Sequence, residues 1–444
     1  MLTDEVARLT AKVRYQMRTA TEGVFGSSTP SSKISLKPNT LPERQARQGG
    51  ARQGHVGHGR RATSEQTADG VETIPLVVHQ CPDCGGPLAP YEWARRTVIE
   101  MRPVRPRTLL YRLETKRCRR CHHTVRARVP AVLSKSLYGN ELVTHVATQH
   151  YVQGVPLGRL EDQLRIGYGS LVGTLHRLAA LLAPVGPRLL HEYRRAPVKH
   201  ADETGWRTDG HNGYVWLFAT KTLSLFRFRQ TRSASVPKEI FGARRLPGVL
   251  VVDRYPGYNH VRCAIQYCYA HLLRKVQDLE KECPDHAEVR AFTETVAPLL
   301  KEAMGLRAAS LSHVAFTRQA QRVKRRLLKA IHASAQHPGI QAIQTIFREH
   351  AKRLYHWARD RTVPADNNLA ERDLRPSVIA RKVSFGSQSD AGAHTRETLM
   401  TILCTLRKRF PDDFVPRFKR ALDQLAEDPT RDPHALLFQE RTPP

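Results

Sequence analysis

Three acidic residues far apart in the sequence, Asp202, Asp253 and Glu371, are the side chains best suited to chemistry. Asp202 lies in HADETGW and Asp253 in VLVVDRYPGY, each after a short apolar stretch, and Glu371 lies in NNLAERDLRP. Carboxylates that converge on one point repel one another unless cations lie between them, and oxygen ligands favour Mg²⁺ or Mn²⁺. Two such ions about 3.5–4 Å apart stabilise the attacking and leaving oxygens of an in-line phosphoryl transfer. The pattern predicts a two-metal site in which Asp253 or Asp202 bridges both ions.

The two aspartates are expected at strand ends, where the backbone is rigid and the side chain meets solvent. Short β-rich segments bounded by turns predict strands at 198–202, 214–220, 223–229, 249–253 and 264–268, with a hairpin around residues 221–222 and a short helix near 236–241. The alternative is that each aspartate is a turn residue. Glu203 is a competing acid beside Asp202, and it should point to the opposite side if the strand continues through it.

Glu371 is expected early in a helix that Asp366 or Asn367 caps and that Pro376 ends or kinks. The face that carries Glu371 is polar, so ordinary solvation is the alternative interpretation. Asp373 is the competing acid on this helix. Strands interleaved with a short helix indicate an α/β core. The chain then turns helical from about 271 to 360, and another helix near 394–409 precedes a tail rich in Pro and Asp.

Two CxxC pairs predict a structural zinc site with tetrahedral thiolate ligation. The pairs are Cys81 with Cys84 and Cys118 with Cys121, with 33 residues between Cys84 and Cys118. This separation exceeds that of the simplest pattern, so a small sheet is expected to fill it. The alternative is four free cysteines. The module is rich in Lys and Arg, which indicates contact with DNA as well.

Residues 140–183 are expected to be helical in three pieces. The breaks are at residues 154–156 and 167–169, the second followed by Ser170 as a possible cap. Short helices across a Gly-containing turn are typical of helix-turn-helix units, although any small helical bundle has the same pattern.

The charge balance indicates a polyanionic partner. Lys and Arg number 71 against 41 for Asp and Glu, which gives a formal charge of +30 and a pI near 10.3. Nucleic acid is the expected partner, and a ribosome-associated or merely basic protein is the alternative. No run of 18 apolar residues and no signal-peptide core is visible, so we expect an intracellular chain without a membrane span.

Several stretches resemble bacterial transposases of the insertion sequence 66 family, within the DDE group. They are HADETGW, VVDRYPGYNH, YCYAHLLRK, NNLAERDLRP with the following RK, and FGS, together with GGARQGHVGH and the two CxxC pairs. The resemblance implies a ribonuclease-H-like catalytic core in which Asp202, Asp253 and Glu371 bind the metal ions. It also implies that Cys268 and His271, as CxxH, lie beside the active site and support it. Tyr269 stands where we expect tryptophan, and this departure does not touch the triad.

The resemblance implies a DNA transposase that uses two Mg²⁺ (or Mn²⁺) ions, with water attacking at the element's end and the freed 3′-hydroxyl attacking target DNA. Four cations are expected to hold phosphates near the site, with ordinary surface charge as the alternative: Arg372, Arg375, Arg381 and Lys382. A homodimer, element-encoded accessory proteins and a cytoplasmic, nucleoid-associated location are also expected. The rival functions are a non-catalytic DNA-binding regulator and a structure-specific nuclease on the same fold.

The expected organisation follows from these patterns and the resemblance. It is an N-terminal amphipathic helix (1–20), a disordered basic linker (21–72), a zinc-ribbon-like module (73–133), a helical DNA-binding region (134–192), a ribonuclease-H-like core (193–272 and 361–410), a helical insertion (273–360), and a C-terminal helix and tail (411–444).

Overall fold

The computed structural model of the chain describes residues 105–117 and 129–439, together with positions 66, 84, 87, 119, 121 and 124–126. The expected N-terminal helix and almost all of the expected basic linker lie outside these residues. Near the start of the described part, β1 (Thr115–Arg117) pairs antiparallel with β2 (Thr124–Arg126). Of the helices that the structure describes, none is long and apolar enough to cross a membrane.

Five strands form one mixed sheet in the order β5-β4-β3-β6-β7. The strands are β3 (Val198–Thr208), β4 (His211–Thr220), β5 (Leu223–Arg229), β6 (Val249–Val252) and β7 (Ala264–Tyr267). β3, β4 and β5 are antiparallel neighbours, whereas β6 runs parallel to β3 and β7 parallel to β6. The predicted strands and the hairpin at residues 221–222 are therefore confirmed. The α/β class is confirmed with them.

The open edge of the sheet at β5 is covered by α12 (Asp390–Arg409). Alternate residues of β5 donate their backbone N–H to α12 side chains spaced four apart: Ser224 to Thr405 at 3.1 Å, Phe226 to Thr401 at 3.0 Å and Phe228 to Glu397 at 3.0 Å. The spacings match because two residues of strand rise about 6.6 Å and four residues of helix about 6 Å. These contacts satisfy donors that an unprotected edge strand would expose.

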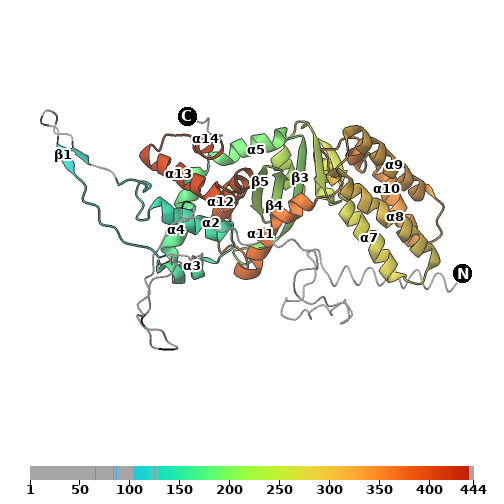
Figure 1. Cartoon of the computed structure of the whole chain (residues 1–444), viewed down its shortest axis with the longest axis horizontal. Coiled ribbons are helices and arrows are strands. Elements are labelled where there is room, and N and C mark those ends of the chain that lie inside the picture. Colours follow the sequence, from blue (N-terminus) through green and yellow to red (C-terminus); the bar gives the residue numbers. More distant parts are fainter. Residues whose placement is uncertain are drawn as a thin grey trace. The chain divides into compact units, whose positions relative to one another are not determined.

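The two faces of the sheet are packed differently. One face carries an aromatic cluster in which Tyr193 of α5 (Val185–Arg195) lies 5.9 Å from the ring of Phe218 and 5.8 Å from that of Phe241, at the end of α6 (Ser235–Phe241). The other face receives α11 (Asn368–Ser384), which is drawn in orange in front of the strands in Figure 1. Each face of the sheet therefore carries at least one helix.

The helical region before the sheet forms the three pieces expected: α2 (Asn140–Tyr151), α3 (Leu157–Leu164) and α4 (Tyr168–Leu182). The expected cap at Ser170 is wrong, because α4 already begins at Tyr168 and its N-cap residue is Gly167. α12 holds this region through Arg396, whose guanidinium donates to His150 Nε2 at 2.8 Å. The same guanidinium lies 5.1 Å from the Tyr151 ring centroid and 5.2 Å from that of Trp206.

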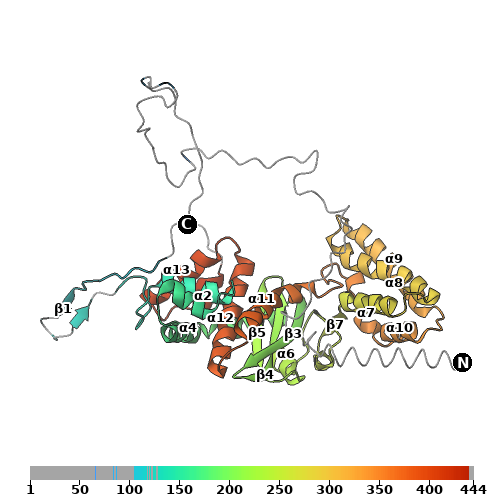
Figure 2. The same cartoon turned by 90° about the horizontal axis from the view of Figure 1, so that it is seen from below.

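The chain between β7 and α11 forms four further helices. They are α7 (Tyr269–Glu282), α8 (Ala287–Gly305), α9 (His313–His332) and α10 (Pro338–Glu349). Both views show these helices gathered at the β7 end of the sheet (Figures 1 and 2). The helical pattern predicted for about 271–360 is confirmed.

α11 continues through Pro376 to Ser384, so of the two outcomes expected for this proline, an end or a kink, the end of the helix is excluded. A proline in a helix removes the hydrogen bond to the carbonyl four residues earlier. That carbonyl belongs to Arg372, an exposed residue, so water can bond it instead. Beyond α12 the tail holds two helices rather than one, α13 (Phe414–Glu427) and α14 (Pro433–Phe438).

Candidate active site

Asp202 and Asp253 belong to neighbouring parallel strands. The last pair of the β3–β6 ladder is His200 opposite Val251, so two further residues along the same register lead to Asp202 and Asp253. β6 ends at Val252, and Asp253 follows it directly, as predicted. Because adjacent strands lie about 4.8 Å apart, this register brings the two carboxylates to the same level of the sheet.

The prediction that Asp202 ends its strand is wrong. β3 continues to Thr208, because residues 203–208 pair with β4, from Glu203 opposite Trp216 to Thr208 opposite His211. What ends near Asp202 is the parallel neighbour β6, and this opens one side of β3 at the aspartate. Asp202 is half-buried, and its backbone is fixed in the central strand of the sheet.

Glu371 reaches the same region because Asn367 fastens the start of α11 to β3. Asn367 Oδ1 accepts a hydrogen bond from His200 Nδ1 at 2.9 Å, and Asn367 Nδ2 donates to the carbonyl of Ala201 at 2.9 Å. Asn367 is 1% exposed and His200 3%. Glu371 lies one turn further on, with its N–H bonded to the carbonyl of Asn367 at 3.2 Å. The helix is capped by Asp366, whose Oδ1 accepts from the N–H of Asn368 at 3.0 Å.

The electrostatics of Asp202 reflect the nearby acids. Burial, followed by the carboxylates of Glu203, Asp253 and Glu371, raises the pKa of Asp202 well above its ordinary value, against a bond from the N–H of Glu203. The carboxylate repulsions indicate that Asp253 and Glu371 act on Asp202 through space. Such a group of acids attracts a cation.

The two competing acids are held by structural contacts. Glu203 is 2% exposed at its side chain, accepts from Tyr258 OH at 2.6 Å and is ion-paired with Arg232 at 2.7 Å. These partners lie on the face of β3 opposite to α11, as strand alternation predicts. Asp373 accepts from Ser224 Oγ at 2.8 Å and pairs with Lys408. Neither carboxylate is free to bind a ligand.

Cys268 and His271 lie at the start of α7, next to Glu371. The N-cap residue Cys268 places its Sγ where the N–H of Asn367 donates to it at 3.2 Å, so the starts of α7 and α11 touch. Burial raises the pKa of the Cys268 thiol to about 11, against backbone hydrogen bonds that lower it. Among the residues that the structure describes, Cys268, His271 and Glu371 are the group whose ligand atoms all lie within 4.8 Å of one another. Asp202 and Asp253 are not part of that group.

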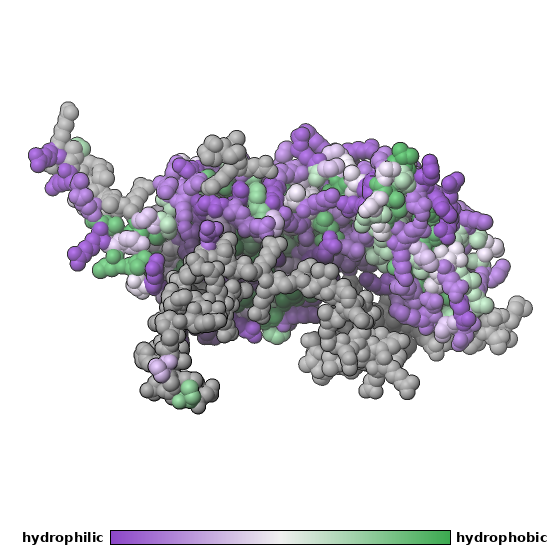
Figure 3. All heavy atoms as spheres, in the orientation of Figure 1, coloured by the Kyte–Doolittle hydropathy of each residue, from purple (hydrophilic) through white to green (hydrophobic). Residues whose placement is uncertain are grey.

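Of the four cations expected to hold phosphates, Arg372, Arg375 and Lys382 are exposed. Arg381 instead donates to Thr204 Oγ1 at 3.1 Å and to the carbonyl of Gly205 at 2.6 Å, which ties the end of α11 to β3. The described surface in Figure 3 is mostly hydrophilic. The three exposed cations are therefore available to a polyanion.

Sequence reasoning missed two residues. Asn367 was considered only as a cap, whereas its side chain joins α11 to the strand of Asp202. Arg254 directly follows Asp253, and its Nε is buried without a hydrogen-bond partner in the described part of the chain. Their positions beside two of the predicted acids are the only signals the sequence offers.

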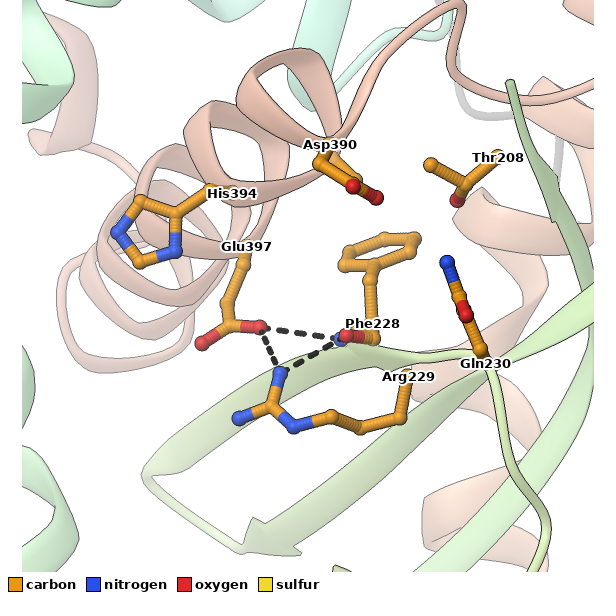
Figure 4. Close-up of a pocket in the computed structure, with 8 residues that line it drawn as sticks. Thr208, Phe228, Arg229, Gln230, Asp390, His394 and Glu397 are labelled. Atoms are coloured by element: carbon orange, nitrogen blue, oxygen red, sulfur yellow. Dashed lines mark hydrogen bonds and ion pairs between the residues drawn. The ribbon is translucent and has the colours of Figure 1, made fainter.

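A pocket of about 230 Å³ lies between β5 and the start of α12. It is lined by Thr208, Phe228, Arg229, Gln230, Asp390, Ala393, His394 and Glu397 (Figure 4). Glu397 accepts from Arg229 Nη1 at 2.9 Å and from the N–H of Phe228 at 3.0 Å. None of the three candidate acids lines this pocket, and its buried carboxylate is already paired. The pocket therefore belongs to the packing of α12 against β5, and we do not assign it a ligand.

The predicted zinc module is only partly described. Cys84 and Cys121 are exposed free thiols, and Cys81 and Cys118 lie outside the described residues. Cys121 lies in the turn between β1 and β2, where Arg117 pairs with Thr124. A hairpin loop is a common setting for such a pair, and the zinc site stays a prediction.

Comparison with known proteins gives two kinds of match. The family model described as "Transposase IS66 family" matches residues 135–395, which is more than half of the chain. The uncharacterized protein y4qI of Sinorhizobium fredii is 26% identical over 326 residues, covering 64% of this chain and 59% of that protein. The uncharacterized protein y4jD of the same organism is 24% identical over 325 residues, covering 64% and 63%. The chain thus spans about three fifths of the length of each relative.

Proposed function

Because the chain belongs to the insertion sequence 66 family of transposases, we propose that it cleaves phosphodiesters at the ends of a DNA element and joins the freed ends to target DNA. The observation that carries the proposal is geometric: the parallel register of β3 and β6 brings Asp253 level with Asp202, and the bond from Asn367 to the carbonyl of Ala201 fixes the helix of Glu371 to β3. Asp202 lies in β3, Asp253 directly follows β6, and Glu371 lies in α11.

The acids are suited to hold two Mg²⁺ or Mn²⁺ ions. Glu371 Oε1 is buried without a hydrogen-bond partner in the described part of the chain, which fits an oxygen that a ligand would satisfy. The carboxylates supply hard oxygen donors of the kind these ions prefer. When bound, the ions would offset the repulsion among the acids and stabilise the attacking and leaving oxygens. Asp202, on the central strand β3, would be one of the residues that hold them.

The order of the strands supports a ribonuclease-H-like core. Three antiparallel strands lead into two parallel ones, and β3, the first of these five strands in sequence, lies in the middle of the sheet. α7–α10 would then be an insertion between β7 and the helix that carries Glu371. The insertion does not displace Glu371, because Asn367 fixes α11 directly to β3.

Phosphate contacts would come from cations around the acids. Arg372, Arg375 and Lys382 are exposed on α11, and Arg254 has a buried Nε that an anionic oxygen would satisfy. Guanidinium groups bind phosphate oxygens through paired hydrogen bonds. His271 lies next to Glu371 at the start of α7 and would support the site from there. We further propose a structural Zn²⁺ at Cys81, Cys84, Cys118 and Cys121, and a homodimer that handles two DNA ends together.

The test is incubation of the protein with labelled duplexes that carry the terminal inverted repeats flanking its gene. Cleavage and joining are scored separately with Mg²⁺ and with EDTA. We expect both reactions in wild type, and a loss of at least about 10³-fold in Asp202→Ala and Glu371→Gln, since electrostatic stabilisation of the transferred phosphate is removed. Glu427→Gln changes an exposed acid on α13 and is the matched control. Cleavage without joining would indicate a nuclease instead. Binding of the duplexes without cleavage would indicate a non-catalytic regulator.

A further inference from the structure

Three different ligand atoms converge where α7 and α11 begin. A sulfur of Cys268, a ring nitrogen of His271 and a carboxylate oxygen of Glu371 lie within 4.8 Å of one another. Cys268 and His271 are three residues apart at a helix start, so their side chains share a face. Glu371 comes from the first turn of the other helix. The backbone bond from Asn367 to Cys268 Sγ fixes the two helix starts to each other.

His271 and Glu371 each have a buried polar atom without a hydrogen-bond partner among the described residues. His271 Nδ1 and Glu371 Oε1 are both buried without a hydrogen bond in the described part of the chain. Buried polar atoms are almost always hydrogen-bonded or bound to a ligand. Two such atoms side by side, next to a thiol, indicate a site that a ligand completes.

The sulfur lies at the start of a helix. Cys268 Sγ accepts a hydrogen bond from the backbone N–H of Asn367 at 3.2 Å. Cys268 is also the N-cap residue of the 14-residue helix α7, whose dipole would stabilise a metal-bound thiolate there. Thiolates are the metal-binding form of cysteine, and hydrogen bonds to the charged form stabilise it.

The donor set selects the cation. A sulfur, an imidazole nitrogen and one carboxylate oxygen suit borderline cations such as Zn²⁺ or Co²⁺, whereas Mg²⁺ prefers oxygen alone. Three protein ligands leave the fourth tetrahedral position open. We propose that Cys268, His271 and Glu371 form a binding site for a Zn²⁺-class cation, distinct from the oxygen site of Asp202 and Asp253.

This site would compete with the proposed reaction, because Glu371 would be a ligand in both. A Zn²⁺-class cation would hold the carboxylate on the Cys268 side and keep it from completing the Mg²⁺ site. The competition rests on the proposed function, whereas the binding itself does not.

The binding is tested by titrating the metal-free, full-length protein with Co²⁺. Thiolate ligation gives a near-ultraviolet charge-transfer band, and tetrahedral geometry gives visible absorption. We expect Cys268→Ser and His271→Ala each to bind one Co²⁺ fewer per chain than wild type, or to bind it at least about 100-fold more weakly. Cys263→Ser is the matched control, since Cys263 is half-buried on the same core and its Sγ donates to the carbonyl of Ala264 at 3.2 Å. Equal Co²⁺ binding and spectra in all four proteins would overturn the site.

Two further measurements keep the result decisive. Glu371→Gln changes the third ligand with almost no change of shape, so it still tests the site if a substitution at the buried Cys268 unfolds the protein. We expect Glu371→Gln to lose the same Co²⁺ ion. The ratio of Mg²⁺-dependent cleavage with and without added Zn²⁺ tests the competition, and we expect Zn²⁺ to inhibit wild type more than Cys268→Ser. Equal inhibition of the two would contradict the competition. Absence of cleavage in wild type would refute the proposed function, and the Co²⁺ titration would still decide the site.

Discussion

Asn367→Ala tests whether Asn367 positions Glu371 at the candidate active site, because it leaves the three candidate acids themselves unchanged. Asn367 makes one hydrogen bond with the His200 ring and one with the carbonyl of Ala201, both at 2.9 Å. Asn367 is 1% exposed and His200 3%, so water cannot take over the two hydrogen bonds that the Asn367 amide makes. Leaving a buried polar group without its bond costs about 1–3 kcal/mol, so the two together predict a destabilisation of roughly 2–6 kcal/mol.

The assay is chemical denaturation of wild type, Asn367→Ala and the neighbouring, exposed Asn368→Ala. Asn368→Ala is expected to change the free energy of unfolding by less than about 0.5 kcal/mol. Mg²⁺-dependent cleavage should fall in Asn367→Ala even at temperatures where it stays folded, since Glu371 is no longer fixed over β3. A free energy of unfolding for Asn367→Ala within about 0.5 kcal/mol of wild type would refute the view that this residue joins the helix to the strand.

Three further predictions concern the scaffold. Burial, followed by the charge of Arg396, lowers the pKa of His150 from 6.5 to about 3, so its stabilising effect is complete above pH 6.5 and is lost as the pH falls towards 3. Between pH 7 and pH 5, the free energy of unfolding should therefore fall by about 2 kcal/mol less in His150→Gln than in wild type. Denaturation of both proteins at both pH values measures this difference. Lys408→Met should destabilise by about 2–4 kcal/mol, because it strips Asp373 of its counter-charge, and adding Asp373→Asn should recover part of the loss in a double-mutant cycle. Gly386→Ala should lower the melting temperature, since φ is +139° and a Cβ would lie 2.2 Å from a β3 carbonyl oxygen, whereas Gly158→Ala, with open space around it, should not.

Much of the architecture could be predicted from local patterns. Short apolar segments between turns identified all five strands, and Gly- and Pro-containing breaks divided the first helices correctly. The extension of β3 beyond Asp202 could not be predicted, because it depends on pairing with a strand that begins at His211. Similarly, nothing local shows that Pro376 sits inside a helix, since an exposed carbonyl makes the proline tolerable there.

The candidate site was harder to predict than the fold. Residue type and strand position indicated Asp202 and Asp253, and their parallel register agrees with that interpretation. The bridge from Asn367 to β3 and the contact between the starts of α7 and α11 join residues far apart in the sequence. Such contacts leave no periodic signal, so the closeness of Glu371 to Cys268 and His271 emerged only in three dimensions.

Backbone cleavage by Fe²⁺ bound in place of Mg²⁺ tests the central claim most directly. Hydroxyl radicals made at the bound ion cut the chain only at nearby residues, and the cut positions are mapped by mass spectrometry. Our account predicts cuts near Asp202, Asp253 and Glu371 that excess Mg²⁺ suppresses and that Asp202→Asn abolishes. Cuts near Glu371 without any near Asp202 and Asp253 would contradict it, because the three acids would then not share an ion.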